Sequence, residues 1–468
     1  MTTTPPPATA TPAPPAAPAL PPSGRPGGTG AWTPSGPGGS PAEAPAAPTP
    51  TAGVQGRLDA VGAWIRAGLA GTPGRLRAVG AVSVVATLLF GLAAGQAFRS
   101  ADGALDRAAA NSDQLVRIQA IQTSVVQADA DATNAFLVGG LEPASQREDY
   151  TRAIGSASRL IAEAAQHQPA DGNALGALNQ SLVAYTSQVE QARGNNRQAL
   201  PVGAQYLRGA SADLRSEALP LLRNLGEANA DRVVEEFDRA GRAALWLVVP
   251  GVLTLIVLVL ALVWLARRMR RYLNLPLLAG ALVVLATVVV GTVGLVAIKR
   301  DVDTTRDGVY AATLSTAQAR IAGFDAKSNE SLTLIARGSG TAFEKAWQAS
   351  NTAVRDELAE LQQNPASSGL SPLPWSPYAG VHQQIRALDE SGKWDEAVTL
   401  ARGEGNATFT AFDTSSDGQL AGLRDQTSQQ LDQSRGWLPV AGALGVLAGV
   451  IAAVCAWWGI SLRLEEYR

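Results

Sequence analysis

Two long apolar segments, residues 243–266 and 275–298, follow each other with a short gap and limit what this chain can fold into. A helix needs about 20 consecutive apolar residues to cross a bilayer, and each segment is long enough. Residues 267–274 join them and are too few to form a domain, so the sequence predicts a hairpin of two membrane spans. Cytoplasmic loops are enriched in Lys and Arg. We therefore expect the joint to face the cytoplasm, where its arginines would contact an inner partner: Arg267, Arg268, Arg270 and Arg271.

Two further apolar segments, residues 78–98 and 437–460, bring the number of predicted spans to four. Several arginines precede the first of them, which places the amino-terminus in the cytoplasm. Four spans return the end of the chain, residues 461–468, to the same side of the plasma membrane. Glycines spaced four apart permit close contact between helices in a bilayer. They occur in the first and last spans: Gly91, Gly95, Gly445 and Gly449.

Residues 99–242 and 299–436 are the segments that this arrangement places outside the cytoplasm. In each, apolar residues recur every three or four positions along four stretches, which Gly- and Pro-containing turns separate. Four helices with short links predict a four-helix bundle, whose first and last helices continue into the neighbouring spans. Similar local sequence in Ala130–Gly139 and Phe324–Gly338 indicates a tandem repeat. The predicted fold is an all-α membrane protein with two extracytoplasmic four-helix bundles.

The amino-terminal part of the chain has a different composition. Residues 1–55 are rich in Pro, Ala, Gly and Thr and lack a periodic apolar pattern, which is typical of a disordered tail. Residues 56–72 space Leu58, Val61 and Ile65 by three and four positions, which favours a short amphipathic helix on the inner membrane face. The net charge of −2 gives no reason to expect a nucleic-acid partner, whereas the lipid bilayer is an expected one.

No sequence motif indicates catalysis, a metal or a cofactor. The histidines His167 and His382 have no Cys, His or paired carboxylate at metal-ligand spacing, so we interpret both as helix-surface residues. The single cysteine, Cys455, lies in an apolar segment, and Gly403–Gly405 is interpreted as a turn. The spans have no ionisable residue in their middles, which disfavours a transporter or pump. We therefore expect a non-enzymatic protein with no catalytic residue, metal or cofactor.

Polar residues near the ends of the two long first helices form the candidate site for a ligand or a protein partner. They fall at matching places in the two repeats, and arginines lie close to them in sequence. The candidate residues are Asp129, Asp131, Asn134, Arg147, Arg152, Asp325, Lys327, Asn329 and Arg337. The alternative is a solvated helix face with ordinary ion pairs, each of which contributes little to stability.

The stretch Asp131–Gly139, followed by the helix that contains Tyr150, resembles the four-helix-bundle sensor domains of bacterial chemoreceptors. From about Leu58 onward, including Asp129–Pro143, Pro201–Leu225 and the Arg-rich joint, the chain is similar to the GlnX family of actinobacterial four-span membrane proteins. This resemblance implies a relay. A solute-binding lipoprotein outside, specific for acidic amino acids or glutamine, would report amino-acid availability through the chain to a cytoplasmic Ser/Thr kinase of the protein kinase G type.

Three functions stay open at this point. In a signal transducer, the output would belong to another protein, because no kinase, methyl-accepting or nucleotide-binding domain is recognisable in the sequence. One duplicated chain would supply both halves of a pseudodimer, and a homo-oligomer is a further option. The other two functions are a structural scaffold of the cell envelope and a direct small-ligand sensor of the chemoreceptor type.

Overall fold

The computed structural model describes residues 72–138, 142–269 and 274–465, and within these ranges every regular element is a helix. The all-α prediction is thereby confirmed. The predicted tail and nearly all of the amphipathic segment, Arg270, Arg271 and the last three residues lie outside the described residues. The α-helices are α2 (Thr72–Phe136), α3 (Ala144–His167), α4 (Gly172–Arg197), α5 (Val202–Asp213), α6 (Leu219–Met269), α7 (Leu275–Thr305), α8 (Ala311–Ile335), α9 (Thr341–Gln363), α10 (Trp375–Glu390), α11 (Trp394–Leu400), α12 (Asn406–Arg435) and α13 (Leu438–Glu465).

Several of these helices continue into one another and form long rods. Three π-helical turns join successive helices without ending them: Leu214–Ala218, Arg306–Tyr310 and Ala401–Gly405. The rods are Gly74–Phe136, Val202–Arg268, Leu275–Ile335 and Trp394–Leu462, and the last of them includes a two-residue turn, Gly436 and Trp437, between α12 and α13. Each contains a segment long and apolar enough to cross a bilayer, so the chain is a multi-pass membrane protein.

The structure corrects the interpretation of Gly403–Gly405 as a turn. These residues lie in the π-helical turn between α11 and α12 and are part of a continuous rod. Gly405 is buried, and a Cβ at this position would lie 3.5 Å from the Cδ1 atom of Ile385 on α10. Packing against α10 therefore keeps the backbone helical despite the low helix propensity of glycine.

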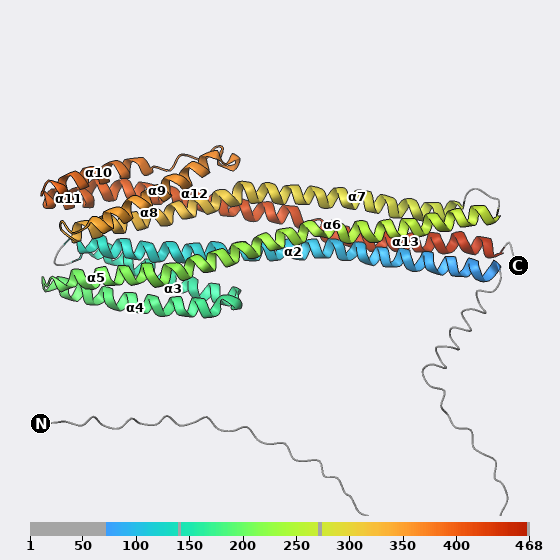
Figure 1. The fold of residues 1–468 in the computed structure, drawn as a ribbon, viewed down its shortest axis with the longest axis horizontal. Helices are drawn as coiled ribbons and strands as arrows, with labels where there is room; N and C mark the ends of the chain where they lie inside the picture. The colour runs from blue at the N-terminus through green and yellow to red at the C-terminus, as the bar shows by residue number, and fades with distance from the viewer. Residues whose placement is uncertain (1–71, 139–141, 270–273, 466–468) are drawn as a thin grey trace, which may run out of the picture. The chain divides into compact units, whose positions relative to one another are not determined.

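Two helical bundles lie side by side at one end of the rods (Figure 1). Bundle 1 consists of the second half of α2 with α3, α4, α5 and the first part of α6, around a core that includes Leu178, Tyr185 and Leu207. Bundle 2 consists of α8, α9, α10, α11 and α12, around an aromatic core that includes Trp375 and Phe412. Each core comes from the apolar stripes that face inward on its helices.

The first helices of the two bundles, α2 and α8, pack against each other along the middle of the molecule. Val126 and Ala130 of α2 belong to the core cluster of bundle 2. Leu137, just beyond α2, packs with Leu334 of α8. Because the same helix of each repeat forms the contact, the two repeats are arranged as the halves of a pseudodimer within one chain.

The four spans pack into a bundle of their own, in which α2 contacts both α6 and α13. The glycines expected to pack helices lie at the contact between α2 and α13. A Cβ on Gly91 would lie 2.8 Å from the Cα atom of Gly449, and one on Gly445 would lie 3.1 Å from the Cβ atom of Ala94. Gly95 faces Val446 of α13. The two helix backbones therefore approach more closely than any larger residue allows.

Candidate functional site

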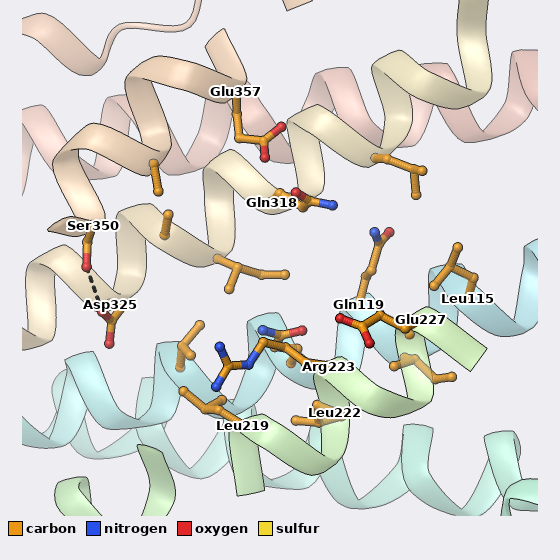
Figure 2. Close-up of a pocket in the computed structure, with 18 of the residues that line it drawn as sticks. Leu115, Gln119, Leu219, Leu222, Arg223, Glu227, Gln318, Asp325, Ser350 and Glu357 are labelled. Atoms are coloured by element: carbon orange, nitrogen blue, oxygen red, sulfur yellow. Dashed lines mark hydrogen bonds between the residues drawn. The ribbon is translucent and has the colours of Figure 1, made fainter. Parts of the chain in front are cut away.

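A cleft of about 670 Å³ separates the two bundles on the side where α6 lies opposite α9 (Figure 2). Helices α2 and α6 form one wall, and α8 and α9 form the other. Aliphatic residues such as Leu115, Leu219 and Leu222 line the interior, and a small number of polar side chains project into it. A volume of this size and a lining of this kind are typical of small-molecule sites.

A buried carboxylate, Asp129 of α2, lies at the centre of a polar network beside this cleft. It is 1% exposed and accepts hydrogen bonds from Tyr185 at 3.2 Å, Ser211 at 2.6 Å and Ser328 at 2.6 Å. Ser328 belongs to α8, so the network already crosses from bundle 1 to bundle 2. A buried charge requires such partners, because it costs several kcal/mol to leave it unpaired.

Arg215 is the cationic partner of Asp129 and also contacts bundle 2. Its guanidinium lies 3.1 Å from Asp129 and 2.9 Å from Asp325 of α8, and it donates to Ser328 at 3.0 Å. Burial opposes the charged form, but Asp129 and Asp325 outweigh it and raise the pKa of Arg215. Its side chain lines the cleft and is 25% exposed. One guanidinium therefore joins the carboxylates of two bundles at the edge of the cavity.

Asp325 has further partners within bundle 2. Ser350 of α9 donates to its Oδ2 atom at 2.7 Å (Figure 2), and Asn329 donates to the same atom at 3.1 Å. Both Asp325 and Ser350 line the cleft. The network thus holds two carboxylates and one guanidinium, so it carries a net negative charge beside the cavity.

Three further side chains that line the cleft have a polar or charged group without a partner among the described residues. Gln119 of α2 is 7% exposed, and its Oε1 atom is buried without a hydrogen bond. Arg223 and Glu227 of α6 reach into the same space from below (Figure 2), and neither belongs to an ion pair among the described side chains. Burial raises the pKa of Glu357 on the opposite wall. These groups offer a donor, acceptors and charges of both signs to a ligand.

A second polar cluster is buried inside bundle 2. Lys327 lies 2.7 Å from Glu330, which pairs with Nδ1 of His382 at 2.9 Å. Nε2 of His382 lies 3.2 Å from Glu344, and the imidazole stacks on Trp347 with 3.5 Å between ring centroids. The structure therefore corrects the interpretation of His382 as a surface residue, because it is 1% exposed. His167, in contrast, is exposed.

The charged groups of this second cluster stabilise one another's ionised forms. Burial alone would raise the pKa of Glu330, but the charge of Lys327 and the hydrogen bond from His382 lower it to about 2. Burial alone would lower the pKa of His382, but hydrogen bonds to Glu330 and Glu344 raise it above its usual value. None of these residues lines the inter-bundle cleft, and we interpret the cluster as a structural network of bundle 2.

Of the nine candidate residues, the structure brings three to the inter-bundle network, namely Asp129, Asp325 and Asn329. Lys327 belongs to the second cluster. The others lie apart from both. Arg147 forms an exposed ion pair with Glu190, and Arg152 forms one with Asp149. The guanidinium of Arg337 stacks on the ring of Trp394. Asp131 and Asn134 each have a buried side-chain oxygen without a partner among the described residues. Burial and the neighbouring carboxylates of Asp149 and Asp413 raise the pKa of Asp131 to about 8.

Two central residues, Arg215 and Gln119, are absent from the candidates that the sequence suggested. Arg215 directly follows Leu214, a core residue, on a rod whose inward face is mostly apolar, with Ser211 as a buried polar residue nearby. An arginine next to a core position, five residues before Pro220, is a sequence signal that could have indicated a buried charged partner. The π-helical turn at Leu214–Ala218 shifts the side chains locally, and turns of this kind are frequent at functional sites. Gln119 gave no comparable signal.

Of the arginines predicted to contact an inner partner, Arg267 and Arg268 lie in the last turn of α6 and are exposed.

Residues 104–238 match the family model of the actinobacterial sensor domain. The matched range covers bundle 1 from the middle of α2 to the first part of α6, and includes Asp129 and Arg215. It supports a sensor or signalling role for an actinobacterial membrane protein. Searches of the curated proteins and of the solved structures found no match.

Proposed function

We propose that this protein is a non-enzymatic transmembrane signal transducer whose input site is the cleft between the two bundles. One observation carries the proposal: Arg215 pairs with a carboxylate from each bundle and also lines the cleft. A ligand or partner group that enters the cleft would compete for this guanidinium and change the contact between the bundles. The sensor-domain match of bundle 1 supports an input function at this place.

The rods give such a change a route through the membrane. Helix α2 runs from the cleft through the first span, and α6 runs from the π-helical turn through the second. Helices that are continuous across the bilayer transmit small translations and rotations between their ends. Helix α6 ends at Met269 and α7 begins at Leu275. We propose that the arginines of the joint between them, residues 267–274, contact the output protein.

The proposed input and output partners follow from the resemblance to the GlnX family. A solute-binding lipoprotein loaded with an acidic amino acid or glutamine would bind the bundles outside the cytoplasm. A Ser/Thr kinase of the protein kinase G type would receive the signal inside. In this proposal both chain ends are cytoplasmic.

Direct binding of an amino acid is a second candidate function, which the cleft itself favours. A free amino acid carries both charges, and the cleft offers Arg215 and Arg223 beside Asp325 and Glu227. Its volume of about 670 Å³ exceeds what one amino acid needs, so a ligand would bind at one end of it.

Calorimetry on the purified full chain in a neutral detergent would test direct binding, with glutamine, glutamate and aspartate as ligands. If the cleft is the site, Gln119→Leu should weaken binding by about tenfold, because it removes a buried hydrogen-bonding group. Gln180→Leu, on the exposed face of α4, is the matched control and should bind normally. Absence of binding up to ~1 mM would exclude the direct sensor, since weaker contacts are not specific.

Crosslinking in living cells, followed by purification and mass spectrometry, would test the relay. Recovery of a solute-binding lipoprotein together with a Ser/Thr kinase is the expected result. Recovery of envelope or division proteins without either of these would instead favour the scaffold function.

A further inference from the structure

A second cavity of about 540 Å³ lies between α2 and α6 where the spans meet the bundles. Four arginines line it: Arg99, Arg107, Arg239 and Arg242. The cavity lies well away along α2 from the inter-bundle cleft, which begins at Leu115. It does not share a lining residue with that cleft, so it is a separate feature of the molecule.

Only part of this positive charge is neutralised by the protein. Arg107 pairs with Glu236 at 2.9 Å, and Arg239 pairs with Glu235 at 2.5 Å and also with Glu236. Arg99 and Arg242 are exposed and belong to no ion pair among the described residues. Two uncompensated guanidinium groups therefore line one cavity, which gives it an affinity for a phosphate or another oxyanion.

The position of the cavity indicates what kind of anion it receives. Arg99 follows directly on the first apolar segment, and Arg242 immediately precedes the second. The cavity is also lined by Leu245 and Trp246, which are 60% and 65% exposed and belong to the apolar span. Tryptophan is enriched at the level of lipid headgroups, where one side of its ring is apolar and the other is wet. A molecule that fills this cavity meets cations at one end and apolar side chains at the other.

We propose that this cavity binds an anionic phospholipid, with its phosphate on Arg99 and Arg242 and its acyl chains along Leu245 and Trp246. Basic pockets between membrane helices bind acidic lipid headgroups in this way. Such a lipid would contact both α2 and α6 directly below the sensor bundle. It would therefore stabilise the contact between the first two spans.

Short-chain lipids that dissolve as monomers provide the test. The full chain in dodecyl maltoside is titrated with dihexanoyl-phosphatidylglycerol, and binding is measured by calorimetry. The double variant Arg99→Gln, Arg242→Gln should weaken binding by at least about tenfold, since each basic residue contributes about fivefold near a lipid phosphate. The matched control is Lys299→Gln, Arg300→Gln, which removes the same charge at the end of the third span but does not line the cavity. Its binding should equal that of the wild type.

Three results would overturn the proposal. Equal binding of dihexanoyl-phosphatidylcholine, in which a choline cation offsets the same phosphodiester charge, would show that the cavity does not select an anionic lipid. Equal loss in both double variants would show general surface attraction. Inorganic phosphate binding as tightly as the lipid, with the same loss in the arginine variant, would show a site for a soluble anion. Thermal unfolding of each variant in detergent verifies that it is folded.

Discussion

At the scale of single residues, Arg215 has the largest energetic consequence. It is the only cation in contact with Asp129 among the described residues, and Asp129 is almost completely buried. A buried carboxylate that loses its cation keeps its desolvation cost without the compensating attraction. The three hydroxyl donors around Asp129 do not supply a charge, so the network depends on this one guanidinium.

We predict that Arg215→Met destabilises the protein by about 3 kcal/mol, the magnitude expected when one partner of a buried ion pair is removed. Adding Asp129→Asn should recover at least half of that loss, because no unpaired charge remains. Chemical unfolding of the full chain in detergent measures both variants. Arg208→Met, on the same rod, removes a partly exposed arginine that belongs to no ion pair among the described residues, and it should change the unfolding free energy by less than about 0.5 kcal/mol. Equal losses at the two positions would contradict this account.

His382 gives bundle 2 a stability that depends on pH. Its pKa is raised in the folded protein by Glu330 and Glu344. The stabilising contribution of His382 to the free energy of unfolding is therefore fully present below its unfolded pKa of about 6.5. It is lost as pH rises through the pKa of His382 in the folded protein. We predict that the difference in melting temperature between the wild type and His382→Gln is larger at pH 6 than at pH 9. His167→Gln alters an exposed residue and should show no such trend. A difference that grows with pH would contradict the assigned sign.

At the scale of helices, the contact between the first and last spans depends on small residues. A side chain at position 449 would meet the backbone of Gly91, which has no room to move because α2 also packs against α6. We predict that Gly449→Val destabilises the span bundle by about 1–3 kcal/mol through overpacking. Ala443→Val, on the exposed face of the same helix, is the control and should be nearly neutral. Unfolding in mixed detergent micelles measures both, and similar effects would show that the contact is not specific.

The helices were largely predictable from the sequence, because each apolar segment and each three–four periodicity is a local property of the chain. The Gly–Pro turns between them were equally readable. The π-helical turn at Ala401–Gly405 was not, because packing against Ile385 decides it rather than glycine propensity. Within the site, Asp129 and Asp325 were found as polar residues on first helices, whereas Arg215 was missed because its two partners come from distant parts of the chain. His382 was misread for the same reason.

At the scale of the whole molecule, the orientation of the four rods across the membrane can be measured by labelling their two ends. We predict that a cysteine at Arg147 reacts with an impermeant maleimide in intact cells, because the proposed topology places the bundles outside the cytoplasm. A cysteine at Arg267 should react only after the membrane is opened. Both changes are made with Cys455→Ser, which removes the one native thiol. Both positions are exposed, so the reverse pattern would invert the proposed topology rather than reflect burial.

The pairing of the two bundles within one chain has a consequence for how the protein works at low copy number. In a receptor made of separate subunits, the paired state dissociates on dilution. Here the joint between α6 and α7 holds one half beside the other at a fixed effective concentration, whatever the amount of protein in the cell. The halves are also free to differ in sequence, so the Arg215–Asp325 contact exists once per molecule rather than twice. If the inter-bundle cleft is the input site, as proposed, one binding event would fill it, because the described residues form this contact once.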